Sequence, residues 1–256
     1  MVIVEHLNVS QIPLLHVVKD ELKNEKTPFI LFIHGFTSAK EHNLHYAYLL
    51  AEEGFRVVLP EAIYHGEREE NMSLIMNLNV NFWKIVINEI QELNIIKQYF
   101  DEQQLIDPDR IGAAGTSMGG ITTLGALTQY DWIKTAVSLM GSPYYEGFLR
   151  NQLDYMKNKG LILPITEEEI EKQIEHLRMF DLSLHREKLS GRPLLFWHGK
   201  KDPVVPFQPT YQFFQEIKPD YEQTPELLKF IVDEQADHKV SREGLKETIA
   251  WFTAYL

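Results

Sequence analysis

The chain has 256 residues, no cysteine, and a formal charge of −12 from 25 basic and 37 acidic side chains. The lack of thiols excludes disulfides, a cysteine nucleophile and thiolate zinc sites, and acidity without basic runs argues against nucleic acid and anionic membranes as partners. No signal-peptide pattern is visible, nor any apolar stretch of the ~20 residues that a membrane helix needs, so we expect a soluble, cytoplasmic protein. The sequence does not indicate its oligomeric state.

Predicted strands and helices alternate along the chain. A hairpin is expected from Val2–Leu7 and Ile12–Val18. Later strands are expected at residues 28–33, 55–59, 110–114, 135–140, 193–197 and 227–232, with helices at 44–53, 82–100, 118–130 and after the N-cap candidate Ser241. The segment Asp107-Pro108-Asp109 is expected to form a turn. This order predicts an α/β fold with a mostly parallel sheet flanked by helices.

Residues 144–190 interrupt the alternation, because they contain two helix-like runs and no convincing strand. The runs are Tyr144–Met156 and Thr166–Phe180, and Thr166 with Glu169 forms a capping-box pattern at the start of the second. We expect a small helical cap, inserted before the strand that precedes the acid residue, over the edge where open α/β sheets bind ligands. The core would then comprise residues 1–143 and 191–256.

The pentapeptide Gly115-Thr116-Ser117-Met118-Gly119 lies between a predicted strand and a predicted helix. Strand, G-x-S-x-G and helix in succession are typical of a nucleophile elbow, which lifts the serine hydroxyl out of the sheet. The turn is so tight that small neighbours are required, and Gly115 and Gly119 meet that requirement. Gly120 would let the helix lie close to the sheet.

A serine needs a base within hydrogen-bond reach, and histidine is the usual one. His238 is the best candidate of ten histidines, because its loop joins the last strand to the last helix and can reach the elbow. Asp202 follows a strand end and suits the carboxylate that orients the imidazole. Weaker candidates for that carboxylate are Asp233, Asp237 and Glu146.

The order Ser117, Asp202, His238 is that of the α/β-hydrolase superfamily. Together with His34-Gly35-Phe36, Asp107-Pro108-Asp109 and the run Gly199 to Pro206, it makes the chain resemble small bacterial serine esterases of the prolyl-oligopeptidase and dienelactone-hydrolase branch. The resemblance implies that Ser117 is acylated, that His238 is the base, and that Asp202 orients it. It also implies an oxyanion hole formed by the backbone N–H groups of Phe36 and Met118, and it implies no metal or organic cofactor.

Several side chains are expected near the active edge and form a candidate substrate-binding set: His34, Tyr64, His65, Tyr144, Tyr145 and Phe148. Two alternatives stay open for them. The His-Gly context of His34 favours a loop-structuring role, and the aromatic residues could pack a cap onto the core.

The sequence therefore predicts a serine hydrolase that cleaves small-molecule carboxylic esters of short to medium acyl length through an acyl-enzyme. One alternative keeps the same three residues and changes the substrate to a peptide, an aminoacyl amide or an acyl thioester. An aminopeptidase would need a carboxylate for the substrate ammonium, for which Glu146 and Glu67 are candidates. The other alternative is a binding protein on a hydrolase scaffold, because fold does not fix function.

Overall fold

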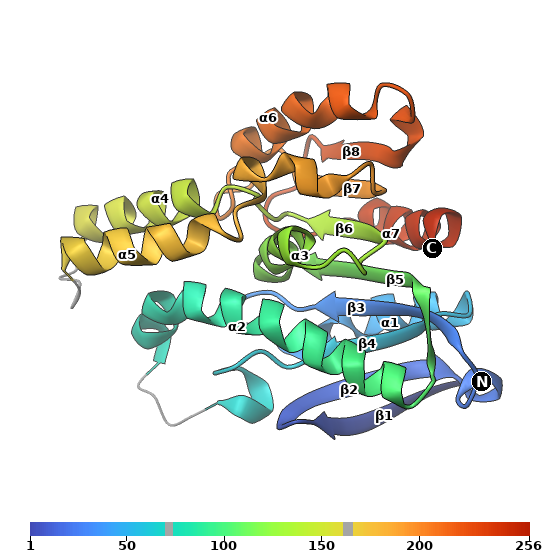
Figure 1. Ribbon diagram of the computed structural model, residues 1–256. Helices are drawn as coiled ribbons and strands as arrows, with labels where there is room; N and C mark the ends of the chain where they lie inside the picture. Colours follow the sequence, from blue (N-terminus) through green and yellow to red (C-terminus); the bar gives the residue numbers. More distant parts are fainter. Residues whose placement is uncertain (70–73, 161–165) are drawn as a thin grey trace.

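One eight-stranded sheet forms the centre of the molecule, with the strand order β1-β2-β4-β3-β5-β6-β7-β8 (Figure 1). The computed structural model describes residues 1–69, 74–160 and 166–256. The hairpin β1–β2 is antiparallel and joins β4 antiparallel, whereas every later pairing is parallel. The strands are β1 (Val2–Val9), β2 (Ile12–Lys19), β3 (Thr27–Ile33), β4 (Arg56–Pro60), β5 (Ile106–Thr116), β6 (Thr135–Leu139), β7 (Leu194–Gly199) and β8 (Leu228–Asp233).

Helices cover both faces of the sheet, with α2 and α3 on one face and α1 and α7 on the other (Figure 1). The helices are α1 (Leu44–Glu52), α2 (Leu74–Glu102), α3 (Met118–Gln129), α4 (Tyr145–Asn158), α5 (Glu167–Arg178), α6 (Phe207–Ile217) and α7 (Arg242–Tyr255). This arrangement confirms the predicted fold class. Helix α6 was not indicated by the sequence patterns.

Strand β3 shows why its sequence is apolar at every position. Phe29, Leu31 and Ile33 pack into the core under α2 and α3. Ile30 and Phe32, which point the other way, pack into the core under α1 and α7. A strand buried on both faces loses the apolar–polar alternation of a half-exposed strand, so the continuous run predicts a central position in the sheet.

Most predicted elements lie within a few residues of the observed ones, and the hairpin is confirmed in full register from Val2 to Lys19. The predicted turn at 107–109 is wrong, because these residues belong to β5. The pairing of β5 with β3 shifts there, between the partners of Thr27 and Phe29, so the segment is an irregular part of a strand. Helix α2 also begins earlier than predicted, at Leu74.

The segment between β6 and β7 contains α4 and α5, which extend from the end of the sheet toward which the arrows of β3 and β6 point (Figure 1). Thr166 caps α5 as predicted, since its hydroxyl accepts the Glu169 N–H and the Glu169 carboxylate accepts the Thr166 N–H. Residues 161–165 of the predicted cap lie outside the described residues. Among the described helices, none is long and apolar enough to cross a membrane.

Candidate active site

The elbow places Ser117 between the end of β5 and the first residue of α3, with a backbone φ of 54°. This left-handed conformation is unfavourable for a serine and persists because the surrounding backbone leaves no alternative. A Cβ at Gly119 would lie 2.1 Å from the Ile33 carbonyl oxygen, and one at Gly115 would lie 2.3 Å from Gly119. Both glycines are therefore required by close backbone contacts.

Three side chains from distant parts of the sequence meet at the elbow. The His238 Nδ1 lies 2.7 Å from Asp202 Oδ2, and its Nε2 lies 2.8 Å from Ser117 Oγ. An ionised carboxylate only accepts, so the ring proton lies on Nδ1 and Nε2 accepts the hydrogen bond from the serine hydroxyl. This is the tautomer in which the ring can take the serine proton.

Asp202 is held on both of its oxygens. Oδ1 accepts the backbone N–H groups of Val204 and Val205, at 2.9 and 3.0 Å, while Oδ2 faces His238. Burial alone would raise the pKa of the Asp202 carboxyl, but the neighbouring His198 and His238 and these backbone donors hold the pKa well below its ordinary value. The carboxylate therefore stays charged beside the imidazole throughout the neutral range.

Two backbone N–H groups beside Ser117 have no hydrogen-bond partner among the described residues: those of Phe36 and Met118. The Phe36 loop lies against the elbow, because a Cβ at Gly35 would be 3.3 Å from the Thr116 carbonyl oxygen and 3.5 Å from Ser117 Cβ. The neighbouring donors of this loop are both used, since Thr37 N–H bonds to His65 Nε2 and Ser38 N–H bonds to the Gly35 carbonyl.

His34 and His65, which belong to the candidate substrate-binding set, lie behind this loop and bond to its backbone. His34 is fully buried; its Nδ1 donates to the Gly35 carbonyl and its Nε2 accepts the Ala62 N–H. His65 is also buried and holds Thr37 through Nε2, and its Nδ1 donates to the Ile63 carbonyl. Both rings use their nitrogens to fix the loop, as the His-Gly context of His34 suggested.

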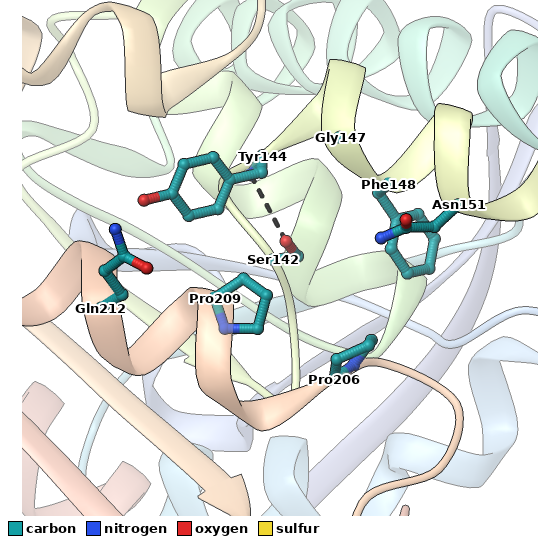
Figure 2. Close-up of a pocket in the computed structure, with 8 residues that line it drawn as sticks. All are labelled: Ser142, Tyr144, Gly147, Phe148, Asn151, Pro206, Pro209 and Gln212. Atoms are coloured by element: carbon teal, nitrogen blue, oxygen red, sulfur yellow. Dashed lines mark hydrogen bonds between the residues drawn. The ribbon is translucent and has the colours of Figure 1, made fainter.

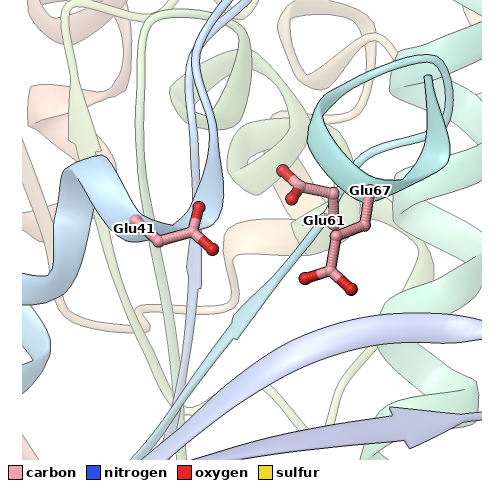
Figure 3. Close-up of side chains that lie close together, drawn as sticks. All are labelled: Glu41, Glu61 and Glu67. Atoms are coloured by element: carbon pink, nitrogen blue, oxygen red, sulfur yellow. The ribbon is translucent and has the colours of Figure 1, made fainter.

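A cage of three carboxylates follows the same loop. The oxygens of Glu41, Glu61 and Glu67 lie close enough together to suggest a metal site (Figure 3). The ammonium of Lys40 already fills it, at 2.8, 2.7 and 2.6 Å from the three carboxylates. Burial of Glu61 favours its neutral form, but His34 and Lys40 lower the pKa of this carboxyl to about 2. The cage is therefore an internal ion-pair network.

A cavity lies between α4 and α6 at the same edge of the sheet (Figure 2). Of the candidate substrate-binding set, Tyr144 and Phe148 line it. Tyr145 is not among the residues that line this cavity; it is fully buried, and its hydroxyl donates to the Ile121 carbonyl. Tyr64 lies elsewhere, half-buried, and its hydroxyl accepts a hydrogen bond from Lys84.

Six residues that the sequence patterns did not indicate complete the lining of the cavity: Ser142, Gly147, Asn151, Pro206, Pro209 and Gln212. Ser142 and Pro206 carried a usable signal, because each follows shortly after a strand end at the active edge. Helix α6, which contributes Pro209 and Gln212, was itself not predicted.

The two carboxylates considered for binding a substrate ammonium are both engaged. Glu146 bonds to Arg150 through Oε1 and to Arg178 through Oε2, and Glu67 bonds to Lys40. Neither offers an unpaired negative charge to a ligand.

The chain resembles several known proteins. The model of the Prolyl oligopeptidase family matches residues 42–256. Over the full length of both chains, the protein is 56% identical to "Putative esterase YitV" of Bacillus subtilis (strain 168) and 29% identical to "Esterase YjfP" of Escherichia coli (strain K12).

Solved structures share the fold. TT1662 from Thermus thermophilus superposes with a TM-score of 0.77 at 20% identity, over 100% of this chain and 98% of that one. The acylaminoacyl peptidase of Pyrococcus horikoshii gives a TM-score of 0.72 at 19% identity, over 100% of this chain and 42% of the longer one. With the family model covering most of its length, the chain belongs to the prolyl oligopeptidase family and has the α/β-hydrolase fold.

Proposed function

We propose that the protein is a serine carboxylesterase that cleaves small-molecule esters of short to medium acyl length. The observation that carries this proposal is the continuous chain of contacts Asp202–His238–Ser117, at 2.7 and 2.8 Å. The names of the two full-length relatives, "Putative esterase YitV" and "Esterase YjfP", support it as well.

In the proposed reaction, His238 Nε2 takes the proton of Ser117 as Oγ attacks the ester carbonyl carbon. The negative charge that develops on the carbonyl oxygen is stabilised by the Phe36 and Met118 N–H groups. The imidazolium then protonates the departing alkoxide, which leaves as the alcohol. Water, deprotonated by the same ring, attacks the acyl-enzyme and releases the acid and the free serine.

Asp202, the two backbone donors and the cap contribute to this reaction in different ways. Asp202 keeps the ring in the productive tautomer and stabilises its charged form. The two backbone donors are fixed before the substrate arrives, so they need no reorganisation as the charge develops, and losing one such donor costs on the order of 3 kcal/mol in the barrier. We further propose that residues 144–190 act as a cap that excludes water from this chemistry.

The decisive experiment compares the parent with Ser117→Ala on 4-nitrophenyl acetate and with a fluorophosphonate probe. The parent should give a burst of one 4-nitrophenol per chain, and the probe should label Ser117 once. Ser117→Ala should lose both the burst and the label, with thermal unfolding unchanged within a few degrees. A variant that turns over as fast as the parent would disprove the proposed nucleophile.

A peptidase is the second candidate, because the family model is that of prolyl oligopeptidases. The engagement of Glu146 by two arginines and of Glu67 by Lys40 argues against an aminopeptidase that binds a free ammonium at these carboxylates. Rates on an ester, an aminoacyl amide and an acyl thioester of matched acyl group separate the three activities. We expect the ester to have the highest kcat/KM.

A further inference from the structure

The cavity between α4 and α6 has a volume of about 250 Å³, and its lining residues Gly147, Asn151, Pro206 and Gln212 are exposed to solvent (Figure 2). One wall comes from α4 and the residues before it, and the other from α6 and the loop that precedes it. None of its eight lining residues carries a charge.

Three independent links connect the lining residues of this cavity to the elbow. Ser142 follows Leu139 by three residues, and the Leu139 carbonyl accepts the Ser117 N–H at 2.8 Å. Pro206 is next to Val205, whose N–H donates to the Asp202 carboxylate.

The third link runs through aromatic rings. The Phe148 ring lies 5.9 Å from the Phe82 ring, which lies 5.4 Å from the Phe36 ring, measured between centroids. The lining of the cavity is thus linked to Ser117, to Asp202 and to the loop that carries the Phe36 N–H.

The chemistry of the walls defines what the cavity can hold. Pro206, Pro209 and Phe148 offer apolar surface. Asn151 has no hydrogen-bond partner among the described residues. The Ser142 hydroxyl accepts the Tyr144 N–H at 3.3 Å, which leaves its own proton available. Such a cavity suits an uncharged, mainly apolar group with at most a few neutral polar atoms.

We propose that this cavity is the subsite for one uncharged arm of the ester, either the acyl or the alkoxy group. If each non-hydrogen atom of the arm takes ~30 Å³, about the volume of one water molecule, the cavity holds an arm of about eight such atoms. This inference rests on the proposed esterase function and specifies its substrate. Each methylene of the arm that is buried there should raise kcat/KM by about fourfold until the cavity is full.

Gly147 allows a direct test, because a Cβ added there meets only Tyr144 Cβ, at 3.7 Å, and a larger side chain has room. Gly147→Leu narrows the cavity from α4, and Gln212→Trp narrows it from the opposite wall on α6. Asp154→Leu is the control, since Asp154 lies on α4, is exposed and does not line the cavity.

Two substrate series identify the arm: 4-nitrophenyl esters from acetate to decanoate, and acetates of alcohols from methanol to octanol. In the parent, one series should show kcat/KM rising with chain length and then falling. Both narrowing variants should reduce the preference for the six-carbon over the two-carbon member of that series by at least tenfold. Asp154→Leu should keep the parent profile.

The outcomes separate the two proposals. If the parent and the control hydrolyse both series but neither narrowing variant changes either chain-length profile, the cavity is not the subsite. If the parent hydrolyses no ester while fluorophosphonate fails to label Ser117, the esterase proposal itself is wrong. A flattened profile in one series supports the subsite and identifies the arm that it binds.

Discussion

Lys40 Nζ lies 2.7 Å from Glu61 Oε2, and both side chains are almost completely buried. The same carboxylate accepts the Lys40 backbone N–H at 3.2 Å, so it holds the end of the loop that begins at His34. His34 in turn holds the Gly35 carbonyl, which belongs to the same peptide unit as the Phe36 N–H. The buried ion pair and the free N–H beside Ser117 are thus parts of one connected segment.

Lys40→Met should destabilise the protein by about 3–5 kcal/mol, because it leaves the buried Glu61 carboxylate without its cation and facing two others. Chemical denaturation at pH 7 measures the difference. Lys172→Met is the matched control, since it removes an exposed pair with Glu168 and should cost less than about 1 kcal/mol. Equal losses in the two variants would contradict a structural role for the cage.

Asp202→Asn should lower kcat by about 10⁴-fold with little change in KM, because an amide at this position favours the wrong tautomer of His238. Steady-state kinetics on one activated ester provides the measurement. Asp237→Asn is the control: this neighbour of His238 is exposed and was a rival candidate for the acid. If Asp237→Asn abolished activity and Asp202→Asn did not, the assignment of the acid would be reversed.

The sequence predicted the meeting of Ser117, Asp202 and His238 because each follows a strand end of a parallel sheet. Carboxyl ends of parallel strands gather at one edge, so knowing the strands is enough to bring such residues together. The elbow adds a local requirement for glycine at positions 115 and 119, which the short sequence pattern records directly.

Side-chain direction could not be predicted in the same way. Tyr144 and Tyr145 are adjacent in the sequence, yet the first lines the cavity and the second is buried against Ile121. Which of the two turns inward depends on how α4 lies on α3, and that packing involves contacts between distant segments. The Lys40 cage was missed for a related reason, since it needs side chains from three separate turns.

Glu89→Gln should make the stability of the protein less dependent on pH between about 4.5 and 7. Glu89 is fully buried, and its Oε1 has no partner among the described residues. Burial raises the pKa of its carboxyl from 4.5 to about 7. The charge of Glu92 adds to this rise, whereas His34 and Arg68 oppose it. The folded protein therefore binds a proton that the unfolded chain releases, and stability present below pH 4.5 is lost as the pH rises through 7.

Gln stays neutral at every pH, so Glu89→Gln should resemble the parent near pH 4.5 and exceed its stability by about 2–3 kcal/mol at pH 8. Denaturation of both proteins at a series of pH values provides the measurement. Comparing variant with parent also removes the opposite slope from Glu61, whose lowered pKa costs stability only as the pH falls from 4.5 toward 2. A stability difference that is constant from pH 4.5 to 8 would show that Glu89 does not titrate in this range.

Gly119→Ala should damage the elbow itself, because the new Cβ would lie 2.1 Å from the Ile33 carbonyl oxygen and 2.6 Å from its carbon. Backbone cannot give way as a flexible side chain can, so β3 and α3 must separate, at a cost of about 1–3 kcal/mol or more. A displacement of Ser117 by about 1 Å should slow its labelling by fluorophosphonate about 100-fold. Gly147→Ala is the control for stability, since its Cβ has room within α4 and alanine favours a helix by about 0.5–1 kcal/mol. Gly119→Ala could instead unfold at the same temperature as the parent and react with the probe at the same rate. In that case the close contact between Gly119 and β3 would not be what holds Ser117 in its left-handed conformation.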